Sequence, residues 1–162
     1  MRARRHYRYV GPAELRDSPA TGDAMRVETL AMLAGWVDAG PCTFVVAPDG
    51  QLRLASRHSE HVALAGGHEV LAAGEMTFGP GPSVVAVTNQ STGYCPDPDC
   101  WPAVAEALDR LDVPHPGGFT DQVVFRLCPA CGERNLVRDH DFTCALCDTD
   151  LPAHWNFAPG DA

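Results

Sequence analysis

Two pairs of cysteines near the end of the chain are the feature that most limits how it can fold. Cys128 and Cys131 are separated by two residues, and after twelve further residues Cys144 and Cys147 repeat that spacing. Two thiolates at this spacing can bind one metal ion, because the turn between them directs both sulfur atoms inward. Gly132, directly after the first pair, can adopt the left-handed conformation that lets the next backbone amide approach the sulfur. We therefore predict that the four thiolates bind a single divalent ion.

The residues around the two pairs indicate how this metal centre is built. Asp148 stands where Gly132 stands in the first pair, and residues 135–138 and 142–143 favour two strands joined by a turn. Over roughly residues 126–152 the chain resembles a zinc ribbon, which implies one structural Zn²⁺. Four sulfur ligands close the coordination sphere, so no water can bind the ion and be activated. A rubredoxin-like iron site and two disulfide bonds are the alternatives for these cysteines.

The rest of the chain has the pattern of antiparallel hairpins covered by helices. Pro48-Asp49-Gly50 joins two alternating runs, and residues 79–82, Gly-Pro-Gly-Pro, join two more. Proline fixes φ and glycine accepts a positive φ, so both segments favour tight turns. The expected strands are 7–10, 42–46, 51–54, 70–78, 84–88 and 123–127, and the expected helices are 24–39, capped by Asp23, and a second from a cap near Asp99 to Leu111. The pattern predicts an α+β fold with antiparallel β-hairpins, two covering helices and a C-terminal zinc ribbon, in domains 1–122 and 123–162.

The central segment carries a second set of motifs. His-Ser at 58–59, Ala-Gly-Gly at 65–67, Ala-Gly-Glu at 73–75 and Ser91 to Pro96 resemble a motif of plant IQ-motif proteins and of toxin-associated fungal and bacterial proteins. The matching positions are His58, Ser59, Gly66, Gly67, Gly74, Ser91, Tyr94 and Pro96. Thr92 and Gly93 depart from the pattern, which has Gly and His there, and no IQ element is present to carry calmodulin binding. The resemblance implies a β-rich core that brings two loops together.

These two polar loops flank one predicted hairpin, so their side chains can meet at one end of the sheet. Such a cleft is where a ligand or a reaction is first sought. The candidate catalytic residues are His58, Glu60, Ser91, Tyr94 and Cys95. Four interpretations stay open: a Cys95 nucleophile activated by His58 or His61, a deaminase-like zinc site, a second structural metal, or a loop held by hydrogen bonds with its thiols free or buried. The deaminase-like site would use His58, Glu60, Cys95 and Cys100, and the structural one Cys95, Cys100 and His115.

Three further side chains in this half of the chain have simpler expectations. His61 and His68 are expected in solvent, and Cys42, at the start of a strand, is expected in the core.

Charge is distributed unevenly along the chain. The net charge of −9 argues against a broad nucleic-acid surface, which needs clustered positive charge. The first ten residues nevertheless hold Arg2, Arg4, Arg5 and Arg8 and no acid. This arm either docks to an acidic partner or a phosphate chain, or is a solvated start of the first strand. At the other end, Trp155 and Phe157 either anchor an interface or hold the tail against its own domain.

Seven cysteines without a secretory signal or a long apolar run favour a reducing, cytoplasmic setting and no membrane span. The sequence therefore predicts an intracellular zinc-binding protein whose ribbon is a protein-binding module. Another protein is the expected partner and nucleic acid is not. The alternative is a small enzyme, a transferase or hydrolase of the toxin-associated type, that uses the loops around His58 and Ser91–Cys95.

Overall fold

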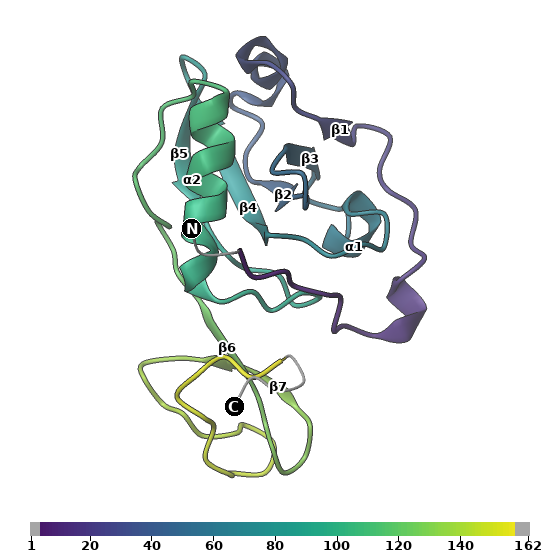
Figure 1. Ribbon diagram of the computed structural model, residues 1–162, viewed down its shortest axis with the longest axis vertical. Helices are drawn as coiled ribbons and strands as arrows, with labels where there is room; N and C mark the ends of the chain where they lie inside the picture. The colour runs from purple at the N-terminus through teal and green to yellow at the C-terminus, as the bar shows by residue number, and fades with distance from the viewer. Residues whose placement is uncertain (1–3, 158–162) are drawn as a thin grey trace. The chain divides into compact units, whose positions relative to one another are not determined.

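A computed structural model of the chain describes residues 4–157 (Figure 1). The chain forms two compact units that divide between Gln122 and Val123, called here the N-terminal unit and the C-terminal unit. Arg2, the first arginine of the basic arm, lies outside the described residues. Within the described part of the chain, no helix is long and apolar enough to cross a membrane.

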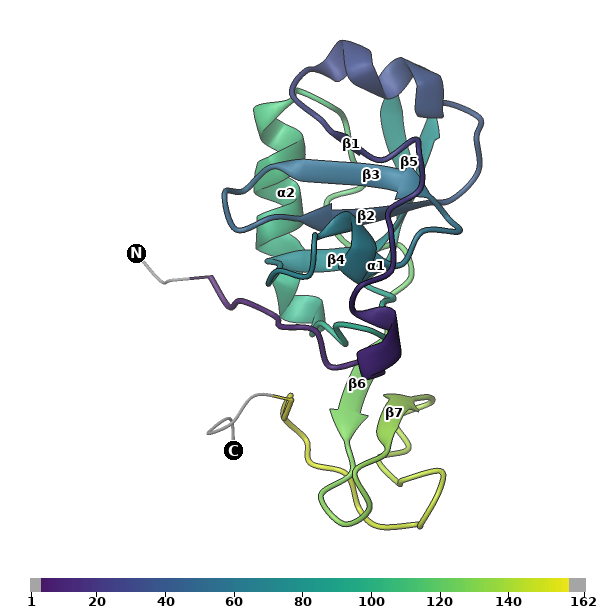
Figure 2. The ribbon, with the colours of Figure 1, turned by 90° about the vertical axis from the view of Figure 1, so that its right-hand side faces the viewer.

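A five-stranded sheet is the centre of the N-terminal unit (Figure 2). Its strands lie in the order β1 (Met25–Arg26), β3 (Leu52–Ser56), β2 (Cys42–Val46), β4 (Ala72–Gly79) and β5 (Ser83–Val87), and all neighbours are antiparallel. All five residues of β2 are buried, as expected for a strand at the middle of a sheet in which four of the five residues are apolar. Gly50 closes the turn between β2 and β3 with a φ of 85°. The α+β fold with antiparallel hairpins is confirmed.

Helices lie on both sides of this sheet (Figures 1 and 2). The long one, α2 (Trp101–Arg110), places Ala103, Val104, Ala107 and Leu108 in the core. The short 3-10 helix η3 (Pro98–Cys100) precedes it, and the Asp97 carboxylate caps η3 by accepting from the Asp99 amide. On the other side, the single turn α1 (His61–Leu64) packs against β2 and β3. The predicted helix from a cap near Asp99 to Leu111 is therefore present as η3 followed by α2, and its cap is Asp97.

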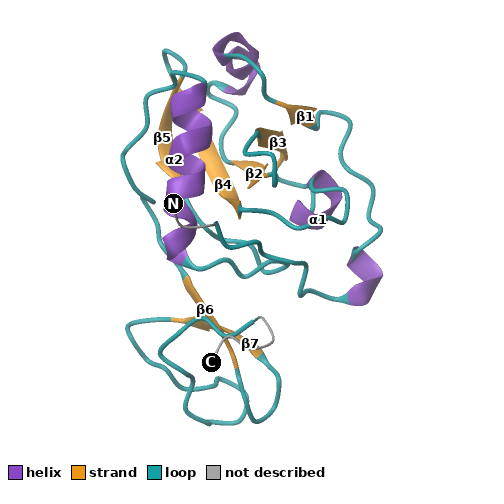
Figure 3. Ribbon diagram, viewed as in Figure 1, coloured by secondary structure: helices purple, strands orange, loops and turns teal. Residues whose placement is uncertain are grey.

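The predicted helix over 24–39 is wrong in its first half (Figure 3). Met25 and Arg26 form β1 on the edge of the sheet, and only the 3-10 helix η2 (Leu30–Trp36) is helical. The edge of β3 offers backbone hydrogen bonds that a helix would forgo, and the Val27 amide donates to Leu52 at 2.8 Å. Asp23 does not cap a helix either, because its carboxylate accepts from the Ser56 amide at 3.1 Å.

Two other predicted strands are reduced to single bridges. Near the N-terminus, the strand expected over 7–10 is the bridge of Tyr7 to Val70, and a 3-10 turn, η1 (Ala13–Leu15), follows it. In the C-terminal unit, β6 (Val124–Leu127) pairs with β7 (Arg134–Val137). The partner strand of β7 therefore precedes the first cysteine pair in the chain. The expected strand at 142–143 contributes only the bridge of Thr143 to Asp150.

The C-terminal tail returns to β6 in the C-terminal unit. Asn156 accepts from the Leu127 amide at 2.9 Å and donates to the Leu127 carbonyl at 2.7 Å, so its side chain extends the ladder like a strand residue. The buried Arg126 guanidinium donates to the carbonyls of Pro152 and Ala153. Trp155 and Phe157, on either side of Asn156, are buried. The tail is thus held by its own unit through polar contacts.

Candidate metal centre

The two cysteine pairs form turns of the same backbone geometry. Cys128 donates its amide to the Glu133 carbonyl and Cys144 donates to the Thr149 carbonyl, both at 2.8 Å. Gly132 and Asp148, at equivalent positions, have φ values of 79° and 64°. Their amides donate back to the carbonyls of the first cysteine of each pair, at 3.0 and 2.9 Å. The equivalence predicted for Gly132 and Asp148 is confirmed, although Asp148 adopts a conformation that costs a non-glycine residue more.

The four thiol groups converge on one point. The sulfur atoms of Cys128, Cys131, Cys144 and Cys147 all lie within 4.8 Å of one another. Across the two turns, the Sγ atoms of Cys128 and Cys147 are 3.5 Å apart and those of Cys131 and Cys144 are 3.6 Å apart. Zinc held tetrahedrally at about 2.3 Å from each sulfur needs edges of about 3.8 Å. The cluster can hold a metal ion, and its sulfur atoms are too far apart for the disulfide alternative, which needs about 2.05 Å.

Amide groups point at the sulfur atoms of Cys128 and Cys144 and stabilise the charged form of these two thiols. The Cys131 amide lies 3.4 Å from the Cys128 sulfur, and the Leu146 amide lies 3.4 Å from the Cys144 sulfur. The contact from the Cys131 amide is the largest effect on Cys128 and lowers the pKa of its thiol. Burial raises the pKa of Cys144, but hydrogen bonds from Asn135 and from the Cys147 and Leu146 amides outweigh it and lower that pKa to about 6. A thiolate is the form that binds a metal.

Asn135 contacts the cysteine cluster but is not among the site residues that the sequence predicts. It lies on β7, is 5% exposed, and makes three contacts. Its Oδ1 accepts from the Ala145 amide at 2.9 Å, and its Nδ2 donates to the Glu133 carbonyl at 3.1 Å and to the Cys144 sulfur at 3.5 Å. One side chain thus ties the strand to both turns. A polar residue between the cysteine pairs was the only signal in the sequence.

Two of the four cysteines are buried within the C-terminal unit and two are exposed. Cys128 and Cys144 are buried with Leu151 in a small apolar cluster, against which Val137 and Phe142 pack. Cys131 and Cys147 are exposed. Each cysteine pair therefore has one buried and one exposed member, and four sulfur ligands would complete the coordination sphere of a tetrahedral ion.

The candidate catalytic residues lie in two loops, and those of the second loop are buried. Ser91, Tyr94 and Cys95 lie in one buried turn, where Ser91 Oγ accepts from the Tyr94 amide at 3.3 Å and the Cys95 amide donates to the Ser91 carbonyl at 2.7 Å. The Tyr94 hydroxyl donates to the His68 carbonyl at 2.7 Å, and burial raises the pKa of Tyr94. The structure brings these three residues together by hydrogen bonds of the kind that hold a loop.

His58 and Glu60, from the other loop, are exposed. No hydrogen bond or ion pair among the described residues joins either of them to Ser91, Tyr94 or Cys95. The position where the resembling motif has histidine is Gly93, and there a Cβ atom would lie 2.9 Å from the Tyr9 ring. The glycine is therefore required by the close approach of Tyr9.

The two alternative metal sites are not formed. In the part of the chain that the structure describes, the four C-terminal cysteines are the single group of three or more His, Cys, Asp or Glu residues close enough to share an ion. His115 instead contacts the Asp109 carboxylate at 2.8 Å. Cys100 is buried, and desolvation raises the pKa of its thiol. Neither the deaminase-like set nor the set with His115 is brought together.

Of the expectations for Cys42, His61 and His68, the one for His61 is wrong. Cys42 is in the core as expected, where burial raises the pKa of its thiol to about 12. His68 is exposed as expected. His61 is not in solvent, because its ring is partly buried with Nε2 2.8 Å from the Gly74 carbonyl. Desolvation lowers the pKa of His61, so the neutral ring donates Nε2–H to that carbonyl.

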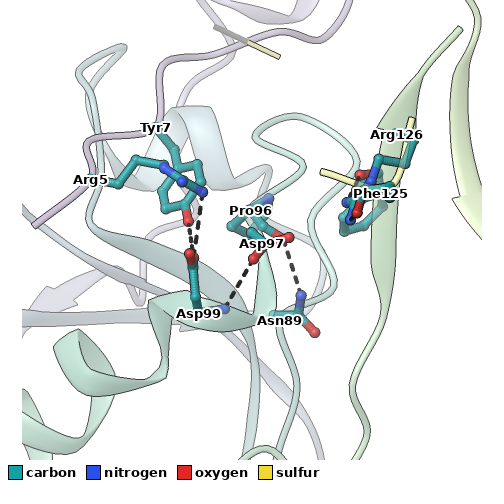
Figure 4. Close-up of polar contacts among 9 residues, drawn as sticks. Arg5, Tyr7, Asn89, Pro96, Asp97, Asp99, Phe125 and Arg126 are labelled. Carbon is teal, nitrogen blue, oxygen red and sulfur yellow. Dashed lines mark hydrogen bonds and ion pairs between the residues drawn. The ribbon is translucent and has the colours of Figure 1, made fainter. Parts of the chain in front are cut away.

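The basic arm is partly neutralised by its own chain (Figure 4). The Arg5 guanidinium and the Tyr7 hydroxyl both reach the Asp99 carboxylate, at 3.5 and 3.1 Å. Arg4 pairs with Glu106 on α2. These pairs hold the start of the chain against η3 and α2, so Arg4 and Arg5 have acidic partners within the protein.

No protein-family model matches the chain, and no curated protein or solved structure is significantly similar to it.

Proposed function

We propose that the C-terminal unit is a zinc ribbon whose Zn²⁺ is structural, and that the protein is a protein-binding module. The single observation that carries the proposal is the convergence of four sulfur atoms from two equivalent turns within 4.8 Å. Tetrahedral thiolate sites are typical of structural zinc and of iron. When bound, the ion cross-links the two turns. The chain's own residues orient the thiolates through the amides of Cys131 and Leu146 and the Asn135 side chain.

The size of the unit supports a structural role for the ion. The unit spans about 40 residues, and the apolar cluster at its cysteine end is small, with Cys128, Cys144 and Leu151 as its buried members. Units of this size usually need a metal or disulfides to fold alone. Binding of a structural zinc ion to four ligands supplies about 10–16 kcal/mol in zinc-finger peptides, which exceeds the net stability of most domains.

Metal analysis tests this part of the proposal. Protein purified without added metal is expected to contain one zinc ion per chain, and Cys131→Ser is expected to lose it. Cys42→Ala is the matched control, because Cys42 is a buried thiol of the N-terminal sheet and is expected to leave the metal content unchanged. Iron in place of zinc, or full zinc content in Cys131→Ser, would refute the assignment.

A surface for another protein is supported by the second turn. Leu146, between Cys144 and Cys147, is 68% exposed, and among the described residues it and Val85 are the large apolar side chains that are exposed. Five acids, Glu133, Asp139, Asp141, Asp148 and Asp150, outnumber the three arginines in the described part of this unit. An apolar tip within an acidic surface suits a protein partner with a basic rim better than a nucleic acid. We place this interaction in the cytoplasm, where thiols stay reduced.

Partner capture tests the surface once the metal is known. A partner that uses this surface is expected to bind the zinc-loaded protein, to be lost with Leu146→Ser, and to be lost after chelation. Val85→Ser is the matched control, since Val85 is 52% exposed but belongs to the N-terminal sheet. Equal loss of binding in both variants would show that the Leu146 surface is not the binding surface.

A further inference from the structure

A cavity in the N-terminal unit is lined by an arginine that has no partner among residues 4–157. The cavity has a volume of about 380 Å³ and is bounded by the turn after β2, by β3 and by the loop that follows α1. Its lining combines apolar groups with three ionisable ones, Arg53, His68 and Glu69. Cavities that bind small molecules typically measure about 300–1,000 Å³.

Arg53 is fixed in position by the sheet. It lies on β3 between two neighbours, opposite Arg26 on β1 and Val45 on β2, so its backbone cannot move independently. Its Nε atom is buried and has no hydrogen-bond partner, and no described residue forms an ion pair with its guanidinium. The guanidinium therefore keeps a positive charge that no acid of the described chain compensates.

The acid of the cavity does not neutralise Arg53. Glu69 is the one carboxylate in the lining, and its Oε1 lies 3.8 Å from His6 Nδ1 on the neighbouring segment. A second cavity, of about 470 Å³, shares Gly67 and Glu69 with the first and adds Arg8 and Arg16 to the same groove. The charges around this groove are therefore mainly positive, although the chain as a whole carries −9.

We propose that Arg53 anchors a phosphate group in this cavity, either free phosphate or the phosphate of a small organic molecule. A guanidinium presents its donors as a fork that matches phosphate oxygens, and Arg53 is part of the cavity lining. Ala47, Pro48 and Val70 form an apolar wall beside the arginine, which suits the organic part of a phosphate ester. Arg8 and Arg16 lie along the groove where a second anionic group would extend.

Titration calorimetry in a phosphate-free buffer tests this site, with inorganic phosphate, ribose 5-phosphate and ribose as probes. Both phosphates are expected to bind and ribose is not. At least tenfold tighter binding of ribose 5-phosphate identifies an organic phosphate as the ligand, and equal affinity identifies free phosphate. Arg53→Met is expected to weaken binding at least tenfold. In nitrogen-15 spectra, the Arg53 Nε–H resonance is expected to shift on binding.

Two variants keep the test decisive. Arg57→Gln is the matched control, because Arg57 follows the same strand, is exposed, and lies outside the lining of the cavity. It is expected to leave the affinity within twofold. Arg53→Lys keeps the charge but removes the fork, and is expected to weaken binding at least fivefold even if Arg53→Met does not fold. Unchanged affinity in Arg53→Lys, equal losses in Arg57→Gln, or binding of ribose alone would overturn the proposal.

Discussion

Replacing Asn135 by alanine tests whether the side chain behind the sulfur atoms builds the metal centre. The change removes three hydrogen bonds, to the Ala145 amide, the Glu133 carbonyl and the Cys144 sulfur. Neutral hydrogen bonds contribute about 0.5–1.5 kcal/mol each, and the 3.5 Å contact to sulfur belongs at the low end of that range. The expected loss is about 2–3 kcal/mol in the zinc-bound state. If metal binding and folding of the unit are coupled, this loss weakens zinc binding roughly 30- to 160-fold.

Competition against a chromophoric chelator measures that affinity directly. Cobalt binding adds a second readout, because the sulfur-to-cobalt absorption band responds to hydrogen bonds at sulfur. Asn135→Asp keeps the acceptor for the Ala145 amide but loses both donors, so its affinity is expected to fall at least as far. Asp141→Asn, in the exposed turn after β7, is the control and is expected to change the affinity less than twofold. Zinc affinity in Asn135→Ala equal to that of the control would refute the reasoning.

Three further outcomes are expected. Chelation of the metal is expected to unfold the C-terminal unit and expose it to proteases, while the far-ultraviolet circular dichroism of α2 persists; joint loss of both would contradict this. Because burial keeps the pKa of His61 below its ordinary value of 6.5, the unfolded chain takes up that proton first as pH falls. The urea concentration needed for unfolding is therefore expected to decline as pH falls from 6.5 through the pKa of His61 in the folded protein. The decline is expected to be smaller in His61→Gln, and His58→Gln, at an exposed histidine, is the control. Gly74→Ala is expected to cost about 3 kcal/mol of unfolding free energy, because its Cβ would lie 1.9 Å from the Thr88 carbonyl oxygen. Gly35→Ala, which meets nothing within 4 Å, is expected to stay within about 1 kcal/mol in the same denaturation assay.

The sequence predicts those features that depend on residues adjacent to one another along the chain. The turn at Gly50 and the turns at Gly132 and Asp148 follow from local conformational preference, and all three are present. Residues 24–39 have a helical apolar pattern, yet Met25 pairs with Leu54 on β3. That pairing depends on where the edge of the sheet lies, which no local pattern contains.

The candidate sites show the same difference between features that follow from local sequence and features that arise only on folding. Four cysteines at regular spacing are a strong signal, since a metal requires the ligands and little else. Asn135 could not be identified, because its importance comes from contacts to Glu133 and Ala145 that exist only after folding. Arg53 gave no signal either, since its lack of an acceptor is a property of the folded surroundings.

The central motif has a structural explanation that also concerns the Arg53 cavity. Gly74 is required because the chain at Thr88 crosses within contact distance of its Cα. Asn89, fully buried, donates to the Pro96 carbonyl at 3.1 Å and closes the turn that contains Tyr94 (Figure 4). Tyr94 in turn donates to the carbonyl of His68, a residue that lines the cavity. Ser91, Tyr94 and Cys95, which look catalytic in the sequence, therefore belong to a hydrogen-bonded turn that is tied to a residue of the cavity lining.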